Sequence, residues 1–190
     1  MPKKSKTKKY IDRYGLKIVS IIKIDLRRTH MQYRIDDQLD ELLKVDGVVD
    51  RSMLNSPHYK LACLYFNKGR EWCETNFKDT DYFKLFNKVL GRVGNVPFRK
   101  FDIFDSIKDG YLRDGFDADH IVVLEKPLII SRYGVEDIHL DPMEIFIGHH
   151  RASALLALGR NIVDVIIVED SEPGTCNING KLSNNYRKIL

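Results

Sequence analysis

The stretch that decides the fold runs from Glu144 to Glu169, EIFIGHHRASALLALGRNIVDVIIVE. Residues 145–147 are apolar and predict a buried strand, while residues 152–158 are strong helix formers and predict a helix. Gly159 is placed to end that helix in the left-handed region, and the β-branched residues of 163–168 predict the strand that follows. Strand, helix and strand in so short a stretch predict an α/β unit.

The turn inside this unit consists of Gly148, His149, His150 and Arg151. Glycine allows a tight bend and a close approach of the backbone to a neighbour. The first N–H groups of a helix have no acceptor within it and mark the positive end of its dipole, so they attract anions. The two imidazoles and the guanidinium add donors at the same place. The turn therefore predicts a phosphate site. The alternative is a purely structural role, because a strand, a glycine turn and a helix are a common connection in α/β proteins.

The order of apolar strand, GHHR turn, helix, glycine and VDVIIVE strand resembles the central motif of the ParB/sulfiredoxin superfamily. Upstream, FDSIKDG at 104–110, followed by the strand at 121–123, resembles the segment that precedes this motif in ParB-like domains. The resemblance covers about residues 100–170, with a weaker trace at 18–26. It implies an α/β (α+β) fold with a small mixed sheet and flanking helices.

The resemblance assigns phosphate contact to the Gly148–Arg151 turn and to Ala152 at the helix start. It brings the segment of Asp105 and Ser106 to the ligand pocket, where Ser106 would contact phosphate. Asp105, His149 and His150 are then the candidate catalytic residues, with helix capping or a solvated position as the alternative for Asp105. His149 stands where sulfiredoxins carry a reactive cysteine, so sulfinic-acid chemistry is not expected. The 21 residues after Glu169 are too few for the helix-turn-helix region of chromosome-partitioning ParB proteins.

The net charge of +4 is concentrated at the N-terminus. In residues 1–14, six Lys and Arg residues against Asp12 give +5, which leaves −1 for the rest of the chain. We expect a disordered basic tail at 1–14 and a single domain at 15–190. Such a tail either attracts nucleic acid through counterion release or only improves solubility. No apolar run is long enough for a membrane span, so we expect a cytoplasmic protein.

Cysteine and histidine spacing predicts no metal centre. The three cysteines, Cys63, Cys73 and Cys176, include no C-x-x-C pair, so we expect reduced thiols in structural positions. His139 and Asp141 lack further ligands at fixed spacing.

Residues 56–91 form an aromatic-rich helical insertion between the first strand, 16–26, and the family motif. Ser56 and Pro57 are typical of a helix start, and helices are expected up to Gly69, over 71–77 and from 79 to Gly91. A short helix is also expected over 39–45. The aromatic residues have three interpretations: a cover over the sheet, a surface for a partner or a second copy, or a base-stacking platform.

Three functions follow, in order of preference. The first is binding of ATP or CTP with Mg²⁺ at the GHHR turn, with hydrolysis or transfer of a phosphate. The second is a DNA-binding or nuclease-type ParB-like protein, in which the turn grips a backbone phosphate and the lysine tail assists. The third is a non-catalytic interaction module that binds a partner protein through the aromatic insertion.

Overall fold

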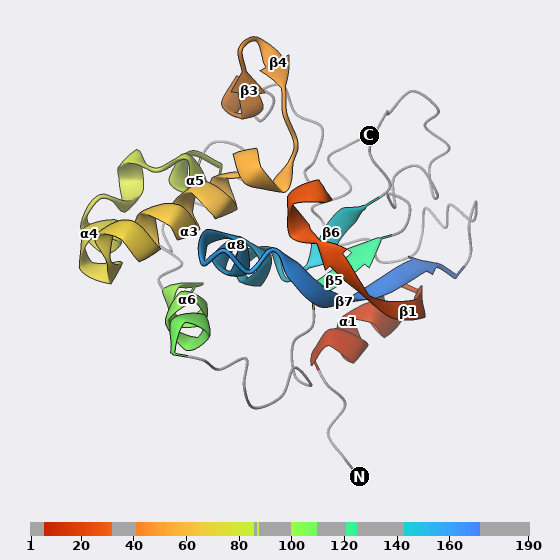
Figure 1. Ribbon diagram of the computed structural model, residues 1–190. Helices are drawn as coiled ribbons and strands as arrows, with labels where there is room; N and C mark the ends of the chain where they lie inside the picture. Colours follow the sequence, from red (N-terminus) through yellow and green to blue (C-terminus); the bar gives the residue numbers. More distant parts are fainter. Residues whose placement is uncertain are drawn as a thin grey trace.

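The computed structural model describes residues 6–31, 41–85, 87, 100–109, 121–124 and 143–171. Their centre is a five-stranded sheet in the order β1-β7-β5-β6-β2, with helices on both faces (Figure 1). The strands are β1 (Leu16–Asp25), β7 (Ile162–Asp170), β5 (Ile121–Leu124), β6 (Glu144–Ile147) and β2 (His30–Met31). The expected α+β class with a mixed sheet is therefore confirmed.

The sheet alternates between pairing directions. β1 pairs antiparallel to β7, β7 parallel to β5, β5 antiparallel to β6, and β6 parallel to β2. In β7 the side chains of Val163, Val165 and Ile167 belong to one apolar cluster, and those of Ile166 and Val168 to another. Because successive residues of a strand point to opposite faces, β7 is buried on both sides, which explains its nearly continuous run of valine and isoleucine.

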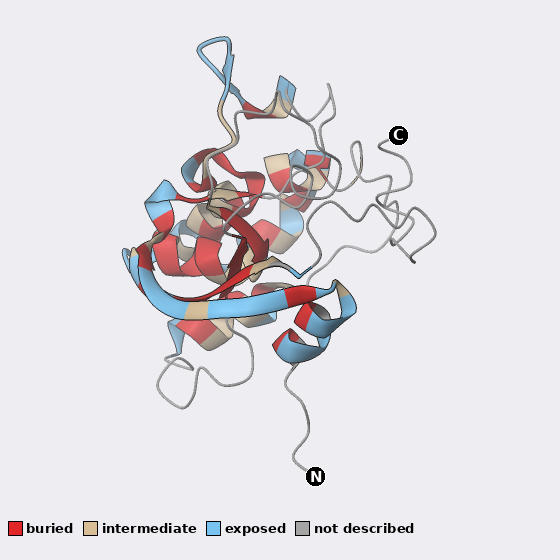
Figure 2. Ribbon diagram, turned by 90° about the vertical axis from the view of Figure 1, so that its right-hand side faces the viewer, coloured by how far each residue is buried: buried red, intermediate tan, exposed pale blue. Residues whose placement is uncertain are grey.

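Strand β1 forms an edge of this sheet and carries a bulge at Val19, where the register with β7 shifts between Ile18 and Ser20. Figure 2 shows its outer surface as a long exposed band in front of the buried strands. Ile21 is 60% exposed, and Lys17 and Lys23 flank the exposed aliphatic residues. Bulges and lysines on an edge strand discourage its pairing with another sheet.

Helix α1 (Lys6–Arg13) occupies most of the segment that we expected to be a disordered tail, so that expectation is wrong for residues 6–13. Thr7 and Ile11 are buried, and their spacing of four places them on one helix face. Ile11 packs in the cluster of Leu16 and Ile166 on one face of the sheet, while Lys8 and Lys9 are exposed. The many lysines in the sequence concealed this narrow apolar face. Residues 1–5 lie outside the described residues.

Four helices are described in or near the expected insertion: α3 (Pro57–Lys68), α4 (Arg70–Thr75), α5 (Asp81–Lys84) and α6 (Phe101–Lys108). The expected start of α3 is confirmed, because Ser56 Oγ accepts a hydrogen bond from Tyr59 N at 3.1 Å. Gly69 follows the helix at φ +87°. The expected continuation of α5 towards Gly91 lies largely outside the described residues.

Helix α8 (His149–Ala157) lies between the sheet and helices α3 and α6 (Figure 1). The largest buried aromatic side chains come from the helices on this side and join the same apolar cluster as β5, β6 and β7: Tyr65, Phe77, Tyr82, Phe101 and Phe104. Three aromatic side chains of the insertion, Tyr65, Phe77 and Tyr82, are thus part of the core, and Tyr59, Phe66 and Phe83 pack against it, as expected of a cover over the sheet, whereas Trp72 is exposed. No helix in the described ranges is long and apolar enough to cross a membrane.

A short hairpin replaces part of the helix expected over 39–45. Residues 41–43 are helical, but β3 (Lys44–Val45) and β4 (Val48–Val49) then pair in a hairpin that projects from the molecule (Figure 1). Asp46 and Gly47 connect the strands with φ values of +50° and +82°. Positive φ at both central residues is the type I′ geometry that an Asp-Gly pair favours. That dipeptide was the signal for a hairpin in the sequence.

Candidate functional site

The GHHR turn joins the end of β6 to the start of α8. Gly148 precedes the helix at φ +97°, and a Cβ built on it would lie 3.1 Å from Ile121 Cα. Glycine is therefore required both by the left-handed backbone and by the close approach of β5. The first helical bond runs from Ala152 N to the Gly148 carbonyl at 2.8 Å, and Gly148 gives the helix no side-chain cap.

His149 is held by the strand that it follows. Its Nε2 lies 2.8 Å from the carbonyl oxygen of Ile145. Because a carbonyl only accepts hydrogen bonds, Nε2 carries a proton, and in the neutral ring Nδ1 is the acceptor. Burial lowers the pKa of His149 to about 4. At neutral pH His149 is therefore an uncharged imidazole with a fixed tautomer.

His150 points into the helical layer. Its Nε2 lies 2.6 Å from Tyr82 Oη, and its ring also lies beside Phe104, with 6.3 Å between centroids. Burial lowers the pKa of His150 well below its usual value, and Lys100 and His149 lower it further. His150 is thus a second neutral imidazole.

His58, on the first turn of α3, completes what we call the histidine cluster: His58, His149 and His150. Its ring centroid lies 4.8 Å from that of His150 and 5.5 Å from that of His149. His58 is only 7% exposed, and burial together with the neighbouring rings lowers its pKa well below the usual value. The sequence did not reveal this residue, because it belongs to the insertion and meets the turn only through the packing of α3 on α8.

Two other side chains near the cluster were also missed from sequence. Tyr82, from α5, is fully buried and forms the hydrogen bond to His150 described above. Lys100, immediately before α6, contributes a positive charge that lowers the pKa of each of the three histidines. The site is therefore built from four separate segments of the sequence: α3, α5, the residue before α6, and the GHHR turn.

The two remaining residues of the motif, Arg151 and Ala152, differ in whether they can donate a hydrogen bond to a ligand. Arg151 is half-buried in the first turn of α8. Ala152 is completely buried, and its N–H already donates to the Gly148 carbonyl. This arrangement leaves Ala152 no donor for a ligand, so its expected role in phosphate binding is reduced to shaping the helix start.

Asp105 and Ser106 lie on α6, and their described contacts do not reach the turn. Asp105 accepts hydrogen bonds from Tyr65 Oη and from Arg70 Nη1, the latter at 2.8 Å. Arg70 also pairs with Asp102 at 2.9 Å. Ser106 Oγ donates to the carbonyl of Asp102 within its own helix, at 2.7 Å. The network around Arg70 joins α6 to α3 and α4, which is a structural role for Asp105.

Glu144, at the other end of β6, is a buried titratable residue that the sequence interpretation passed over. It is 7% exposed, and no described residue forms a hydrogen bond with its carboxyl group. Burial raises its pKa to about 7, although the positive charge of Arg51 opposes this shift. The carboxyl group at the start of β6 and the imidazoles that follow its end thus have pKa values shifted in opposite directions.

Within the described residues, no three or more His, Cys, Asp or Glu side chains are arranged to hold a metal ion. Cys63 and Cys73 are free thiols, and Cys73 is buried, so burial raises its pKa to about 11. His139, Asp141 and Cys176 lie outside the described residues.

Comparisons of the chain with protein-family models, with curated proteins and with solved structures gave no match. The resemblance to the ParB/sulfiredoxin superfamily therefore stays a prediction from the sequence. The geometry at the start of α8 carries the functional argument.

Proposed function

We propose that the chain binds the phosphate group of a nucleotide, ATP or CTP, at the Gly148–Arg151 turn. The observation that carries this proposal is the start of a nine-residue helix at a glycine turn, with no side-chain cap from Gly148, beside a cluster of desolvated histidines. Free helix N–H groups and the dipole favour an anion at such a place. The sequence resemblance over residues 100–170 points to the same turn.

The electrostatics of the histidine cluster support an anion as ligand. Burial and the charge of Lys100 make a further positive charge on the rings unfavourable, which is why their pKa values are lowered. A negative charge at the same place is favoured by Lys100 and Arg151, and it would favour protonation of the rings. Binding of phosphate should therefore be accompanied by proton uptake, and it should strengthen as the pH falls towards 6.

The same arrangement also suits hydrolysis or transfer of the bound phosphate. Mg²⁺ would arrive with the nucleotide and screen the charge of its phosphates. His149 has its Nε2 proton held by the Ile145 carbonyl, so its Nδ1 is the nitrogen that can take up a proton when phosphate binds and donate it to the leaving oxygen. We assign His149 this role in hydrolysis or transfer, and His150 a role in shaping the site through Tyr82.

A thermal-shift titration with Mg²⁺-ATP and Mg²⁺-CTP tests the proposal. A ligand at a hundred times its Kd stabilises the folded protein by about 2.7 kcal/mol, which is readily measured. Arg151→Ala should abolish the shift, whereas Arg28→Ala, an exposed arginine of the segment that follows β1, should leave it intact. If neither nucleotide raises the Tm at pH 6 or pH 8, the proposal fails.

DNA binding is the second candidate, and helix α1 is the observation that favours it. Lys8, Lys9 and Arg13 are exposed on this helix, so the basic charge lies on a folded surface. Because Ile11 is part of the core, deletion of the segment would damage the fold, and charge reversal of Lys8 and Lys9 to Glu is the better test. The wild type should shift DNA in a gel with a steep salt dependence that the variant loses. Absence of any shift at low salt would exclude this function.

A further inference from the structure

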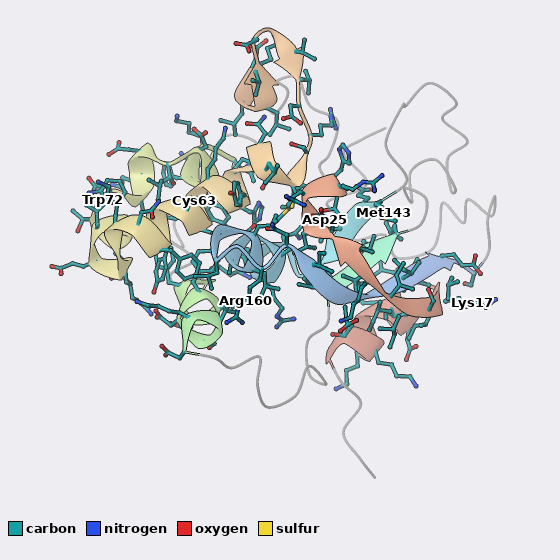
Figure 3. The ribbon with its side chains drawn as sticks, viewed as in Figure 1. Lys17, Asp25, Cys63, Trp72, Met143 and Arg160 are labelled. Carbon is teal, nitrogen blue, oxygen red and sulfur yellow. The ribbon has the colours of Figure 1, made fainter. Side chains whose placement is uncertain are left out.

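A hollow of about 520 Å³ lies at the other end of α8, where the chain turns into β7 and passes the end of β1. Hollows of this size hold small-molecule ligands in many proteins. It is separate from the GHHR turn, because α8 runs between them. Figure 3 labels Arg160, in the turn between α8 and β7, and Asp25, at the end of β1.

Three cationic side chains from three segments line this hollow: Lys23 of β1, Arg27 of the turn after β1, and Arg160. Lys23 Nζ pairs with Asp164 at 3.0 Å, and Arg27 Nη2 pairs with Asp25 at 2.6 Å. No described residue forms a hydrogen bond or an ion pair with the guanidinium of Arg160. Three positive charges against two carboxylates leave +1 in and around the hollow, and Arg160 carries it.

The end of α8 does not cancel this charge. Gly159, at φ +74°, and Arg160 close the helix, because Gly159 N donates to the Leu156 carbonyl at 2.9 Å and Arg160 N to the Leu155 carbonyl at 2.8 Å. This Schellman pattern satisfies carbonyl groups that would otherwise face an incoming anion.

The hollow is also lined by the polar side chains of Asn161 and Asp164, by Gly159, and by three aliphatic residues. Leu155 and Val163 are buried and belong to the main core, whereas Ile162 is 66% exposed. A charged rim over an apolar base suits a ligand with an anionic group on a less polar body.

We propose that this hollow binds a phosphate group. A phosphate carries up to two negative charges and three acceptor oxygens, so it can engage Arg160 with two parallel hydrogen bonds and still attract Lys23 and Arg27. A single carboxylate would only repeat what Asp25 and Asp164 already provide. The Lys23–Asp164 pair is solvent-exposed and contributes little free energy, so Lys23 can turn towards the ligand at small cost. Arg27 stays in its two-point pair with Asp25 at the rim of the hollow.

The test follows backbone amide signals by NMR during titration with inorganic phosphate, with AMP and with a short single-stranded DNA, at constant ionic strength. The signals of Gly159, Arg160 and Asn161 should shift and saturate. Saturation with phosphate or AMP alone identifies a free phosphate compound as the ligand, and saturation with DNA alone identifies the nucleic-acid backbone. The signals of 148–151 report the proposed nucleotide site in the same spectra, so each proposal can fail alone.

Three variants make the test specific. Arg160→Gln should weaken binding about tenfold, because it removes a charge-assisted pair of hydrogen bonds. Asp164→Asn should tighten binding about threefold, because it releases Lys23 from its ion pair. The matched control is Lys17→Gln at the other end of β1, where Lys17 pairs with Glu169 at 3.4 Å (Figure 3).

The proposal is overturned if no probe gives saturable shifts at 159–161. It is also overturned if Lys17→Gln weakens binding as much as Arg160→Gln does, since overall charge would then explain the effect. Weaker binding by Arg160→Gln could come from a damaged fold. Tighter binding by Asp164→Asn could not, so this variant keeps the proposal testable.

Discussion

Basic side chains gather around both ends of α8, but they are uncharged at its start and charged at its end. At its start, His58, His149 and His150 are desolvated and uncharged at neutral pH. At its end, Lys23, Arg27 and Arg160 line an open hollow in which their charges are solvated. Burial therefore decides whether a basic side chain acts as a cation or as a neutral hydrogen-bonding group. The two ends should accordingly respond very differently to substitution, to pH and to salt.

The largest difference should appear in the two glycines that flank the helix. Gly148→Ala should lower the free energy of unfolding by roughly 3 kcal/mol, because the left-handed backbone is strained and the new Cβ would crowd Ile121. Gly159→Ala has the same backbone strain with no atom within 4 Å of the Cβ, so it should cost only about 1 kcal/mol. Urea denaturation measures both. Equal losses would contradict the close approach of β5.

Acidification should destabilise the protein through the start of α8. The folded-state pKa of His149 is about 4, below the value of 6.5 for an unperturbed histidine, so the unfolded chain binds more protons in this window. Stability is then complete above about pH 6.5 and is lost as the pH falls towards 4, with a loss of roughly 2 kcal/mol from His149 alone between pH 7 and pH 5. The Tm measured across this range should fall, and His149→Gln should flatten the curve. An unchanged slope in that variant would contradict the lowered pKa.

Glu144 should give stability the opposite pH dependence to that of His149. Its folded-state pKa of about 7 lies above the ordinary value of 4.5, so the stability it provides is complete at low pH and is lost as the pH rises through 7. Glu144→Gln should therefore gain roughly 1 to 2 kcal/mol relative to the wild type between pH 6 and pH 8. Denaturation at the two pH values measures the difference. If the variant and the wild type differ in their free energy of unfolding by the same amount at both pH values, the carboxyl group does not titrate in this range.

Removal of one hydroxyl group should give the smallest effect. Tyr82→Phe deletes the hydrogen bond to His150 and should cost about 1 kcal/mol in the free energy of unfolding. Tyr59→Phe, on the partly buried side of α3, serves as the control. An NMR titration of the His150 ring should show that its pKa changes only in the Tyr82 variant. No change in either variant would mean that Tyr82 does not set the protonation of His150.

The sequence predicted the elements whose pattern is local. The β6–α8–β7 unit and the start of α3 follow from apolar runs, from the Ser56-Pro57 pair and from Gly148 and Gly159. The apolar face of α1 was hidden among lysines, because only Thr7 and Ile11 mark it. His58 and Tyr82 reach the turn through the packing of helices from the insertion, and no spacing in the sequence encodes that contact.

The position of β7 in the sheet also bears on how the chain acquires its structure during synthesis. β7 lies between β1 and β5, so β1 has no neighbour in the described sheet until β7 has been made. The Lys23–Asp164 pair joins residues 141 positions apart. Contacts between such distant residues form late, because a long loop must close first. The aliphatic edge of β1 therefore stays without its pairing strand while most of the chain emerges from the ribosome, and chaperone binding at residues 16–25 of stalled chains should reveal it.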